Sequence, residues 1–474
     1  MPTLEFLSKE SIQSTHSTTL DVLETTGIRV ENRTALQLLR DAGCVVEEQL
    51  VKIPSSLVIE ALQKAPNSFN LYTRNGEKSY SIAKDNVLFN PGSSAVYFKD
   101  QNLRMVRKGM SKDVIALTQL VDMLEHINLQ STALIASDVP ETISDFHRLF
   151  ISLKYSSKPI VTGAFRKEGV KDMQMLLEVA VGGPENLANK PIAIFDCCPL
   201  SPLVWNDSSC QNVLDCATAG IPAEIVPAPL MGATSPVTLN GTIVQSNAET
   251  LSGIVIAQLA NSGTPVIYGG APGTFDMKYA TPRFGAIEAI MVACASAEMG
   301  KYYSIPTHGY LGTSDSIIED SQSGFESALG IVLAALARIN VVSGPGMLAH
   351  LNCQSLEKLV IDNEICGSAY RLVRGIGFED LDIVAKLLNV VGPGGNYLGQ
   401  KHTSKRLRSE HLMPSDVLCR LMPDKWLSQG SKSMLARANE KVTSLLQDYT
   451  YEEPMNLDEL EQTYDKLMKR YNLP

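Results

Sequence analysis

The sequence predicts an α/β protein, a (β/α)8 TIM barrel with helical N- and C-terminal extensions. From residue 86 onward, eight short apolar or β-rich runs each end in Gly, Pro, Ser or Asp. Each run precedes a stretch with helical periodicity. A doubly wound open sheet is the competing architecture. Neither G-x-G-x-x-G after the first strand nor G-x-x-x-x-G-K-[ST] occurs, so the usual nucleotide signatures of that architecture are missing.

Eight parallel strands are expected, and each is a short apolar run typical of a buried strand. Parallel strands need right-handed helical crossovers, so eight strand–helix units in series close most naturally into a barrel. The expected strands lie within residues 86–92, 129–135, 158–165, 191–197, 221–229, 264–270, 304–312 and 340–346.

The crossover helices are expected between these runs, and several end in Gly, as a left-handed C-cap favours. Their apolar residues recur three and four positions apart. The expected ranges are 111–126, 141–156, 170–182, 212–220, 244–263, 284–300, 323–340 and 355–375.

The two flanks of the barrel are expected to be mostly helical and to brace it or cover one end. Residues 1–85 contain three helical patterns and a small extended piece. Residues 375–474 are helical apart from the Gly-rich stretch at 390–399. The predicted organisation is therefore an N-terminal extension (1–85), the barrel (86–374) and a C-terminal extension (375–474).

Composition excludes several classes of protein. The chain has 474 residues, 44% hydrophobic, with a net charge of −10, which argues against general affinity for nucleic acid or acidic membranes. The N-terminus resembles no signal or transit peptide, and the apolar runs are too interrupted for a membrane span. Nine cysteines without regular spacing indicate a reduced, cytoplasmic protein without a metal site. A barrel of this size is also expected to form a homo-oligomer.

Aromatic and acidic residues gather where the predicted strands end. Active sites of this fold lie at the carboxyl ends of the strands. The stretch "THGYLGTSDSIIEDSQSGFESALG" (307–330) spans the end of strand seven, its loop and the start of helix seven. Such a ring favours a small methylated cation, which aromatic faces bind by about 0.5–2 kcal/mol each. The alternatives are that each aromatic only packs the core, that Asp320 and Glu326 cap or pair locally, and that His350 is structural.

These residues carry a resemblance to a known family. The run from "GGAPGTFDM" to "VVSGPGML" (269–348), continuing through "SLEKLVIDNEI" (355–365), resembles the trimethylamine:corrinoid methyltransferase family. Its signature pieces are "TSDS", D-x-Q-x-G-x-E, "LAALA" and G-x-G-M-L, and "GPGGNYLGQKHTSKRLR" (392–408) is also similar. The trimethylamine members contain pyrrolysine, which this sequence lacks. The resemblance is therefore to the pyrrolysine-free branch, the quaternary-amine demethylases.

The resemblance implies a barrel enzyme that moves a methyl group from a quaternary amine, first of all glycine betaine, to cobalt(I) of a corrinoid (cobalamin). The corrinoid is carried by a cognate partner protein, so none is expected to be tightly bound, and the barrel mouth should be open to it. Alternatives are another quaternary amine, such as carnitine or proline betaine, a non-catalytic quaternary-amine-binding protein, or a metal-dependent lyase on the same barrel.

The site residues expected on this basis fall into three groups. The catalytic group is His350, Asp315 and Asp320, with the two aspartates in supporting roles. The substrate-binding group is Tyr97, Tyr268, Phe275, Tyr310, Phe325, Glu326 and Asn352. The cofactor-binding group is Gly312, Thr313, Ser314, Gly344 and Gly346.

Overall fold

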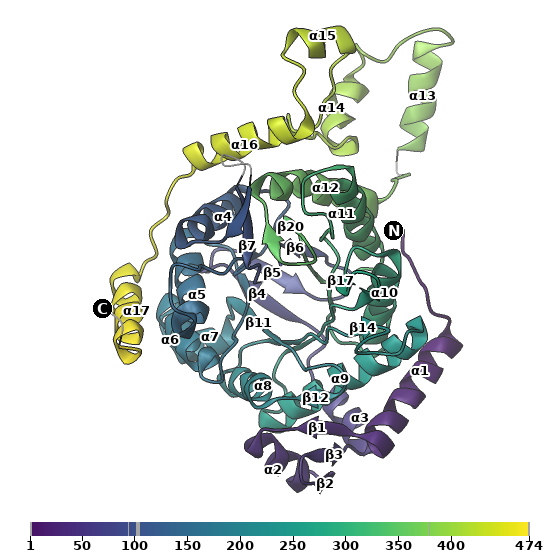
Figure 1. Cartoon of the computed structure of the whole chain (residues 1–474). Helices are drawn as coiled ribbons and strands as arrows, with labels where there is room; N and C mark the ends of the chain where they lie inside the picture. The colour runs from purple at the N-terminus through teal and green to yellow at the C-terminus, as the bar shows by residue number, and fades with distance from the viewer. Residues whose placement is uncertain (1, 93, 101–104, 379, 473–474) are drawn as a thin grey trace.

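The chain folds around a closed barrel of eight parallel strands, seen along its axis in Figure 1. The structure is a computed structural model that describes residues 2–92, 94–100, 105–378 and 380–472. A strand lies within each of the eight predicted runs. In chain order the barrel strands are β6 (Leu88–Asn90), β9 (Gln130–Ser131), β10 (Ile160–Gly163), β11 (Ala193–Cys197), β13 (Ala223–Ile225), β15 (Val266–Tyr268), β18 (His308–Tyr310) and β19 (Val341–Ser343).

Parallel pairing runs through β9–β10–β11–β13–β15 and through β18–β19–β6. A parallel bridge between Tyr268 and Thr307 joins the first set to the second. On the other side, the N–H groups of Asn128 and Leu129 both donate to the carbonyl of Phe89. The strand order therefore follows the chain order around the whole barrel, as predicted.

Eight helices surround the strands, one after each of them, and all eight match the predicted stretches. The loops before α10 and α11 lie at the carboxyl end of the barrel. The helices are α4 (Ser111–Met123), α5 (Ser144–Tyr155), α6 (Gly169–Val181), α8 (Asp207–Ala219), α9 (Leu239–Ala260), α10 (Ile287–Tyr302), α11 (Ser321–Leu336) and α12 (Leu356–Arg374).

The amino-terminal end of the barrel is closed by a hairpin of β4 (Phe69–Tyr72) and β5 (Ser79–Ile82). Leu71 and Ile82 of this hairpin are fully buried against inward-facing side chains of the barrel strands. The lower interior is thus an apolar core, and any site must lie at the opposite end. The strand residues in this core are Leu88, Val161, Ile194, Ile267 and Val341.

The N-terminal segment forms a second layer on one side of the barrel. It contains α1 (Lys9–Asp21), a π-helical turn (Val22–Thr26), α2 (Arg33–Asp41) and α3 (Ser55–Lys64). A sheet with the order β12–β1–β3–β2 joins it to the barrel. The three helices were predicted, whereas this sheet was expected only as a small extended piece. Its strands are β1 (Ile28–Val30), β2 (Val45–Glu47), β3 (Leu50–Lys52) and β12 (Val204–Trp205).

The C-terminal segment is helical, with α13 (Leu381–Val391), α14 (Lys401–Glu410), α15 (Pro423–Ser428), α16 (Met434–Asp448) and α17 (Leu457–Arg470). α16 packs on α12 and α4, and α17 packs on α5 and α6. In contrast, α13 to α15 extend away from the barrel (Figure 1) and contain no buried residue. The predicted division at residues 85/86 and 374/375 stays a proposal.

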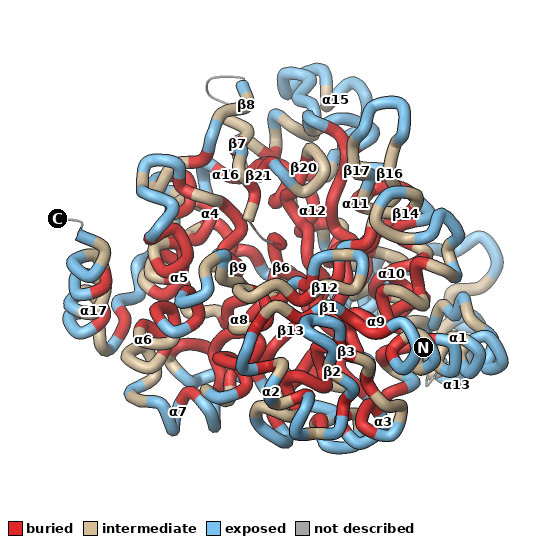
Figure 2. Tube along the Cα trace, turned by 60° about the horizontal axis from the view of Figure 1, so that its bottom comes forward, coloured by how far each residue is buried: buried red, intermediate tan, exposed pale blue. Residues whose placement is uncertain are grey.

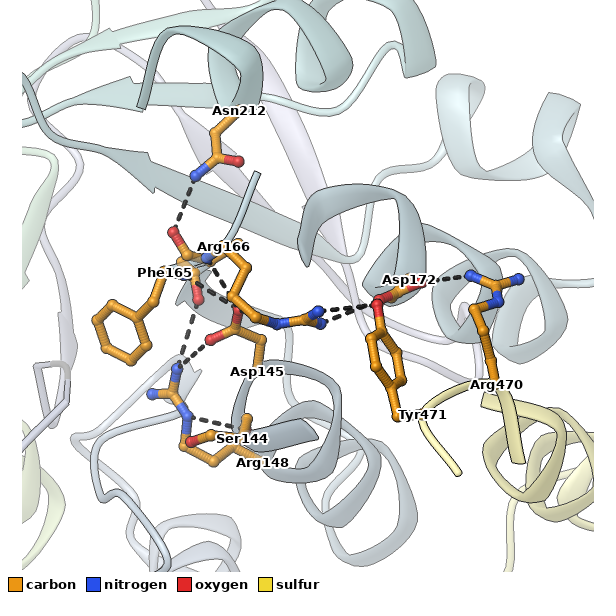
Figure 3. A network of polar contacts seen from close by, with 11 residues as sticks. Ser144, Asp145, Arg148, Phe165, Arg166, Asp172, Asn212, Arg470 and Tyr471 are labelled. Atoms are coloured by element: carbon orange, nitrogen blue, oxygen red, sulfur yellow. Dashed lines mark hydrogen bonds and ion pairs between the residues drawn. The ribbon is translucent and has the colours of Figure 1, made fainter. Parts of the chain in front are cut away.

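A network of charged side chains fixes α17 to the barrel (Figure 3). The fully buried carboxylate of Asp172, on α6, accepts hydrogen bonds from Arg166 (3.0 Å), Arg470 (2.6 Å) and Tyr471 (2.6 Å). Arg166 belongs to the loop after β10, and the other two donors lie at the end of α17 and just beyond it. The C-terminal helix therefore braces a loop at the carboxyl end of the barrel.

Burial follows this architecture. In Figure 2 the buried trace is concentrated in the barrel strands and the inner sides of the surrounding helices, while α15 and the outer side of α17 are exposed. No helix in the described part of the chain is both long and apolar enough to cross a membrane.

Candidate active site at the carboxyl end of the barrel

A small apolar cluster lies at the carboxyl end of the barrel, separate from the main core. Tyr310, at the end of β18, packs with Val226, Ala271 and Leu351. These four residues come from the ends of β18, β13 and β15 and from the loop after β19. Tyr310 is 8% exposed and Leu351 is half-buried. The cluster therefore forms an apolar lining where active sites of this fold lie.

A carboxylate stands beside this apolar lining. The hydroxyl of Tyr310 donates to Asp196 Oδ2 at 3.1 Å. Asp196 is on β11, two residues after Ile194 of the inner apolar core, so both side chains point into the barrel. Asp196 is partly exposed, whereas the neighbouring strand residues are buried. A ligand at the Tyr310 cluster would thus lie close to a negative charge.

Below Tyr310, a chain of polar side chains crosses the barrel. The ring of His308 meets the ring of Tyr310 edge-on, with centroids 5.0 Å apart. Its Nδ1 lies against the carboxyl group of Glu224, and its Nε2 is 2.9 Å from Ser343 Oγ. Ser343 Oγ is in turn 3.0 Å from Asn90 Oδ1. Four strands, β13, β18, β19 and β6, contribute to this chain.

The hydrogen-bond directions in this chain follow from Asn90. Its Oδ1 accepts from the N–H of Gly92 at 2.9 Å, so it also accepts from the Ser343 hydroxyl. That hydroxyl has one proton, and it therefore accepts from His308 Nε2–H. His308 Nδ1 then faces the Glu224 carboxyl group, and this contact is compatible either with a neutral pair or with an imidazolium and a carboxylate.

Burial favours the neutral form of both Glu224 and His308. Both side chains are fully buried. Burial raises the pKa of Glu224 well above its usual value, and burial lowers the pKa of His308 to about 4. Desolvation disfavours the charged form of each group, and this is the larger cause in both cases.

Two of the three predicted catalytic residues are in contact: Asp315 lies in the loop after β18, and His350 lies in the loop after β19. Asp315 accepts hydrogen bonds from the backbone N–H groups of Phe284 (2.9 Å) and Gly285 (3.0 Å). Its Oδ1 lies 3.2 Å from Nδ1 of His350, whose side chain is 27% exposed. Asp315 can therefore orient the partly exposed imidazole of His350. This placement agrees with the supporting role expected for Asp315.

Asp320 and Glu326 shape the same loop. Asp320 caps α11 by accepting from the N–H of Ser323 (3.0 Å), and it also accepts from the hydroxyl of Ser316 (3.1 Å). Glu326 accepts from the Ser314 hydroxyl (2.6 Å) and from the N–H of Asp315 (2.8 Å). Both carboxylates thus hold the loop, in agreement with the alternative that Asp320 and Glu326 cap the helix or pair locally.

Four of the five predicted cofactor-binding residues, Gly312, Ser314, Gly344 and Gly346, donate their backbone N–H groups within the protein. A Cβ on Gly312 would lie 2.5 Å from Pro345, and one on Gly344, whose φ is +124°, would lie 2.8 Å from the nitrogen of Thr313. The glycines therefore serve the close approach of two mouth loops. Thr313 is buried within this contact. The four N–H groups donate from Gly312 to Ser343, from Ser314 to Met347, from Gly344 to Asn90 and from Gly346 to Asp362. The buried hydroxyl of Thr313 has no hydrogen-bond partner among the described residues.

Of the predicted aromatic ring, only Tyr310 lies inside the barrel mouth. Tyr268 points outward from β15: it is 1% exposed, its hydroxyl donates to Asn247 of α9, and its ring lies against Tyr303. Its expected place at the mouth is therefore wrong. Phe325 is 67% exposed on α11. Phe275 lies on β16 (Gly273–Asp276), which forms a hairpin with β17 (Thr281–Arg283).

Tyr97 and Asn352 are neighbours at the edge of the mouth. Tyr97 opens β7 (Tyr97–Asp100), which pairs with β8 (Met105–Lys108), and its N–H donates to the carbonyl of Asn352 at 2.8 Å. The side-chain amide of Asn352 donates to the carbonyl of His350 at 3.2 Å. Tyr97 is 42% exposed and Asn352 is exposed. Both therefore adjoin the loop that carries His350.

Several residues of the site were not predicted from the sequence. Glu224 and His308 lie within strands, whereas most of the predicted site residues follow the strand ends. A signal for Glu224 was present, since it is the one charged residue in the apolar run "IPAEIVPAP". An isolated acid in a buried strand needs a partner. Val226, Ala271 and Leu351 carry no chemical signal of their own.

Comparison with known proteins places the chain in a family. The sequence profile of the family described as trimethylamine methyltransferase (MTTB) matches residues 1–472. Trimethylamine methyltransferase MttB of Desulfitobacterium hafniense (strain DSM 10664 / DCB-2) is 31% identical over 450 residues, 94% of this chain and 90% of that protein. Glycine betaine methyltransferase of Desulfitobacterium hafniense (strain Y51) is 30% identical over 451 residues, 95% of this chain and 94% of that protein.

A solved structure agrees on the fold. The crystal structure of the monomethylamine methyltransferase of Methanosarcina barkeri matches with a TM-score of 0.53 at 12% identity, covering 94% of this chain and 89% of that one. The chain therefore belongs to the trimethylamine methyltransferase (MTTB) family and is a methyltransferase with a (β/α)8 barrel fold.

Proposed function

We propose that this protein transfers a methyl group from a quaternary amine, first of all glycine betaine, to the cobalt of a corrinoid carried by a partner protein, leaving dimethylglycine. One observation carries the proposal: the apolar cluster around Tyr310 lies beside the carboxylate of Asp196 at the end of the barrel. A fully methylated nitrogen has no N–H to donate, so it is bound by apolar and aromatic surfaces and by nearby negative charge. The cluster and the carboxylate offer this combination.

The polar chain beneath the cluster is consistent with a reaction that needs no proton transfer. Nitrogen in a quaternary amine is already positively charged, so the product tertiary amine leaves without being protonated first. Glu224 and His308 lie against each other inside the barrel, and burial favours the neutral form of both. The role of the protein is then to hold one N–CH3 bond in line, and positioning of this kind contributes about 7–11 kcal/mol.

His350 and Asn352 are our candidates for binding the substrate carboxylate. Both are accessible at the mouth, and Asp315 fixes the orientation of the imidazole. A cobalt(I) corrinoid supplies the nucleophile when its carrier docks at the open end. We further propose a cytoplasmic homo-oligomer. All nine cysteines are free thiols, and α13, which has no buried residue, offers apolar surface for association.

The test combines the purified protein, a corrinoid protein reduced to cobalt(I), and glycine betaine, with carnitine and proline betaine in parallel. The expected result is loss of the cobalt(I) spectrum together with formation of dimethylglycine. A reaction without any amine provides the baseline. Transfer from carnitine or proline betaine alone would replace glycine betaine as the substrate. Tight binding of an amine without transfer would indicate the non-catalytic binding protein instead.

A further inference from the structure

The loop that brings Leu351 into the apolar cluster has an unusual backbone. It connects β20 (Met347–Leu348) to β21 (Cys353–Gln354), two short antiparallel strands after β19. Within it, Ala349, His350 and Leu351 have φ values of +50°, +57° and +65°. Three successive left-handed residues are rare when none of them is glycine. Such strain persists only where the surrounding structure holds it, and it is concentrated at functional sites.

The surroundings hold the loop from both sides. The N–H of Ala349 donates to the carbonyl of Ser316 at 2.7 Å, which ties it to the loop after β18. At the other end, the carbonyl of Asn352 accepts from the N–H of Tyr97 at 2.8 Å. Between these anchors, Asp315 contacts the imidazole of His350. The loop is thus fixed to the loops that follow two other barrel strands.

Glycine would adopt these φ values without strain. The contacts of the side chains at 350 and 351 therefore explain why the loop has residues other than glycine. His350 points to Asp315, and Leu351 packs with Tyr310, Val226 and Ala271. Leu351 is the half-buried member of that cluster, whereas the other three are at most 8% exposed. It therefore forms the outer side of the apolar lining, nearest to the open end.

We infer that Leu351 is a specificity-determining residue, the wall that sets how large a methylated ammonium group the Tyr310 cluster admits. The inference rests on the proposed function, because the cluster must be where the ammonium group binds. The other walls, Tyr310, Val226 and Ala271, are fixed at or just after barrel strands, whereas Leu351 is held by a loop. A smaller residue at this position would admit a bulkier nitrogen, and a larger one would exclude it.

Binding by titration calorimetry tests the inference without any corrinoid. Glycine betaine has a compact trimethylated nitrogen, and proline betaine has a bulkier ring nitrogen. In Leu351→Ala, the affinity for glycine betaine should fall while that for proline betaine stays or rises, which changes their ratio by about tenfold. Ala349→Gly keeps the Leu351 side chain and should leave the ratio unchanged. Leu200→Ala, at a side chain 52% exposed outside the cluster, is the matched control.

The outcomes separate the two proposals. An equal change for both amines in Leu351→Ala, or none, overturns the role of Leu351 and leaves the proposed function standing. If wild-type protein binds neither amine, the proposed function fails and the inference falls with it. Leu351→Val provides the test if the alanine variant fails to fold. It keeps most of the packing and should shift the ratio of the two affinities in the same direction.

Discussion

His308 Nδ1 lies against the Glu224 carboxyl group inside the barrel, and burial favours the neutral form of both side chains. At the other ring nitrogen, the amide oxygen of Asn90 fixes the direction of the Ser343 and His308 hydrogen bonds. The neutral form also avoids an ion pair in a fully buried position, where desolvation of two charges costs more than their attraction returns. The barrel interior thus contains a polar layer between the apolar core below and the Tyr310 cluster above.

Glu224→Gln should fold as well as the wild type, because the amide can donate to His308 as the carboxyl group does. Glu224→Ala should lose about 1–3 kcal/mol, the cost of leaving a buried acceptor without a partner. Urea unfolding at pH 7 measures both. Equal losses in the two variants would show that Glu224 does not act as a hydrogen-bond donor.

The pH dependence of stability provides a second prediction for the same pair. Burial raises the pKa of Glu224 above its unfolded value of 4.5, so above pH 4.5 the folded state binds a proton that the unfolded state has lost. Wild-type stability should therefore fall relative to Glu224→Gln as pH rises, by up to about 1.4 kcal/mol per pH unit. The free energy of unfolding, measured from pH 5 to 8, gives this difference. The exposed Glu459→Gln is the control, and it should show no such trend.

The eight strands and helices of the barrel could be predicted because each type of element leaves a distinct pattern. Buried parallel strands are short continuous apolar runs, and the crossover helices repeat every three to four residues. The sheet formed by β1, β2 and β3 was less visible, because its strands have three residues each and are partly exposed. Short strands of this kind depend on their pairing partners.

The candidate site was harder to predict because a barrel strand is buried on both faces. In β15, Ile267 points into the barrel and Tyr268 points out to α9, yet both are apolar and fully buried. Hydrophobicity alone does not tell the two faces apart, and a register error of one residue exchanges them. The strained loop at 349–351 was invisible for another reason: no glycine marks it.

Tyr310 offers a test of the proposed binding site that separates its ring from its hydroxyl. Tyr310→Phe keeps the aromatic face and loses the bond to Asp196, so binding of glycine betaine should weaken by no more than about threefold, while stability falls by about 1 kcal/mol. Tyr310→Ala removes the face as well and should weaken binding by about 10-fold or more. Titration calorimetry gives both values. Similar losses in the two variants would assign the effect to the hydroxyl instead of the ring.

His350→Ala should lower turnover with little loss of stability, because the side chain is partly exposed and its polar contact is with Asp315. Asp315→Ala should instead reduce both turnover and stability, since the carboxylate also accepts hydrogen bonds from the N–H groups of Phe284 and Gly285. Steady-state kinetics with glycine betaine, alongside thermal unfolding, separates the two effects. If His350→Ala keeps wild-type kinetics, His350 does not belong to the site.

The Asp172 network predicts that the C-terminal helix stabilises the barrel. Asp172→Ala leaves Arg166, Arg470 and Tyr471 without their shared acceptor, and removal of one partner from a buried ion pair costs about 3–5 kcal/mol. The exposure of Arg470 lowers this free-energy cost, so Asp172→Ala is expected to lose about 2–3 kcal/mol. Tyr471→Phe removes one hydrogen bond and should cost about 1 kcal/mol. Urea unfolding measures both, with Glu459→Gln on the exposed side of α17 as control. A loss in Asp172→Ala no larger than that in the control would mean that α17 is held by its apolar contacts, such as the stacking of Tyr464 on Phe150 at 4.3 Å.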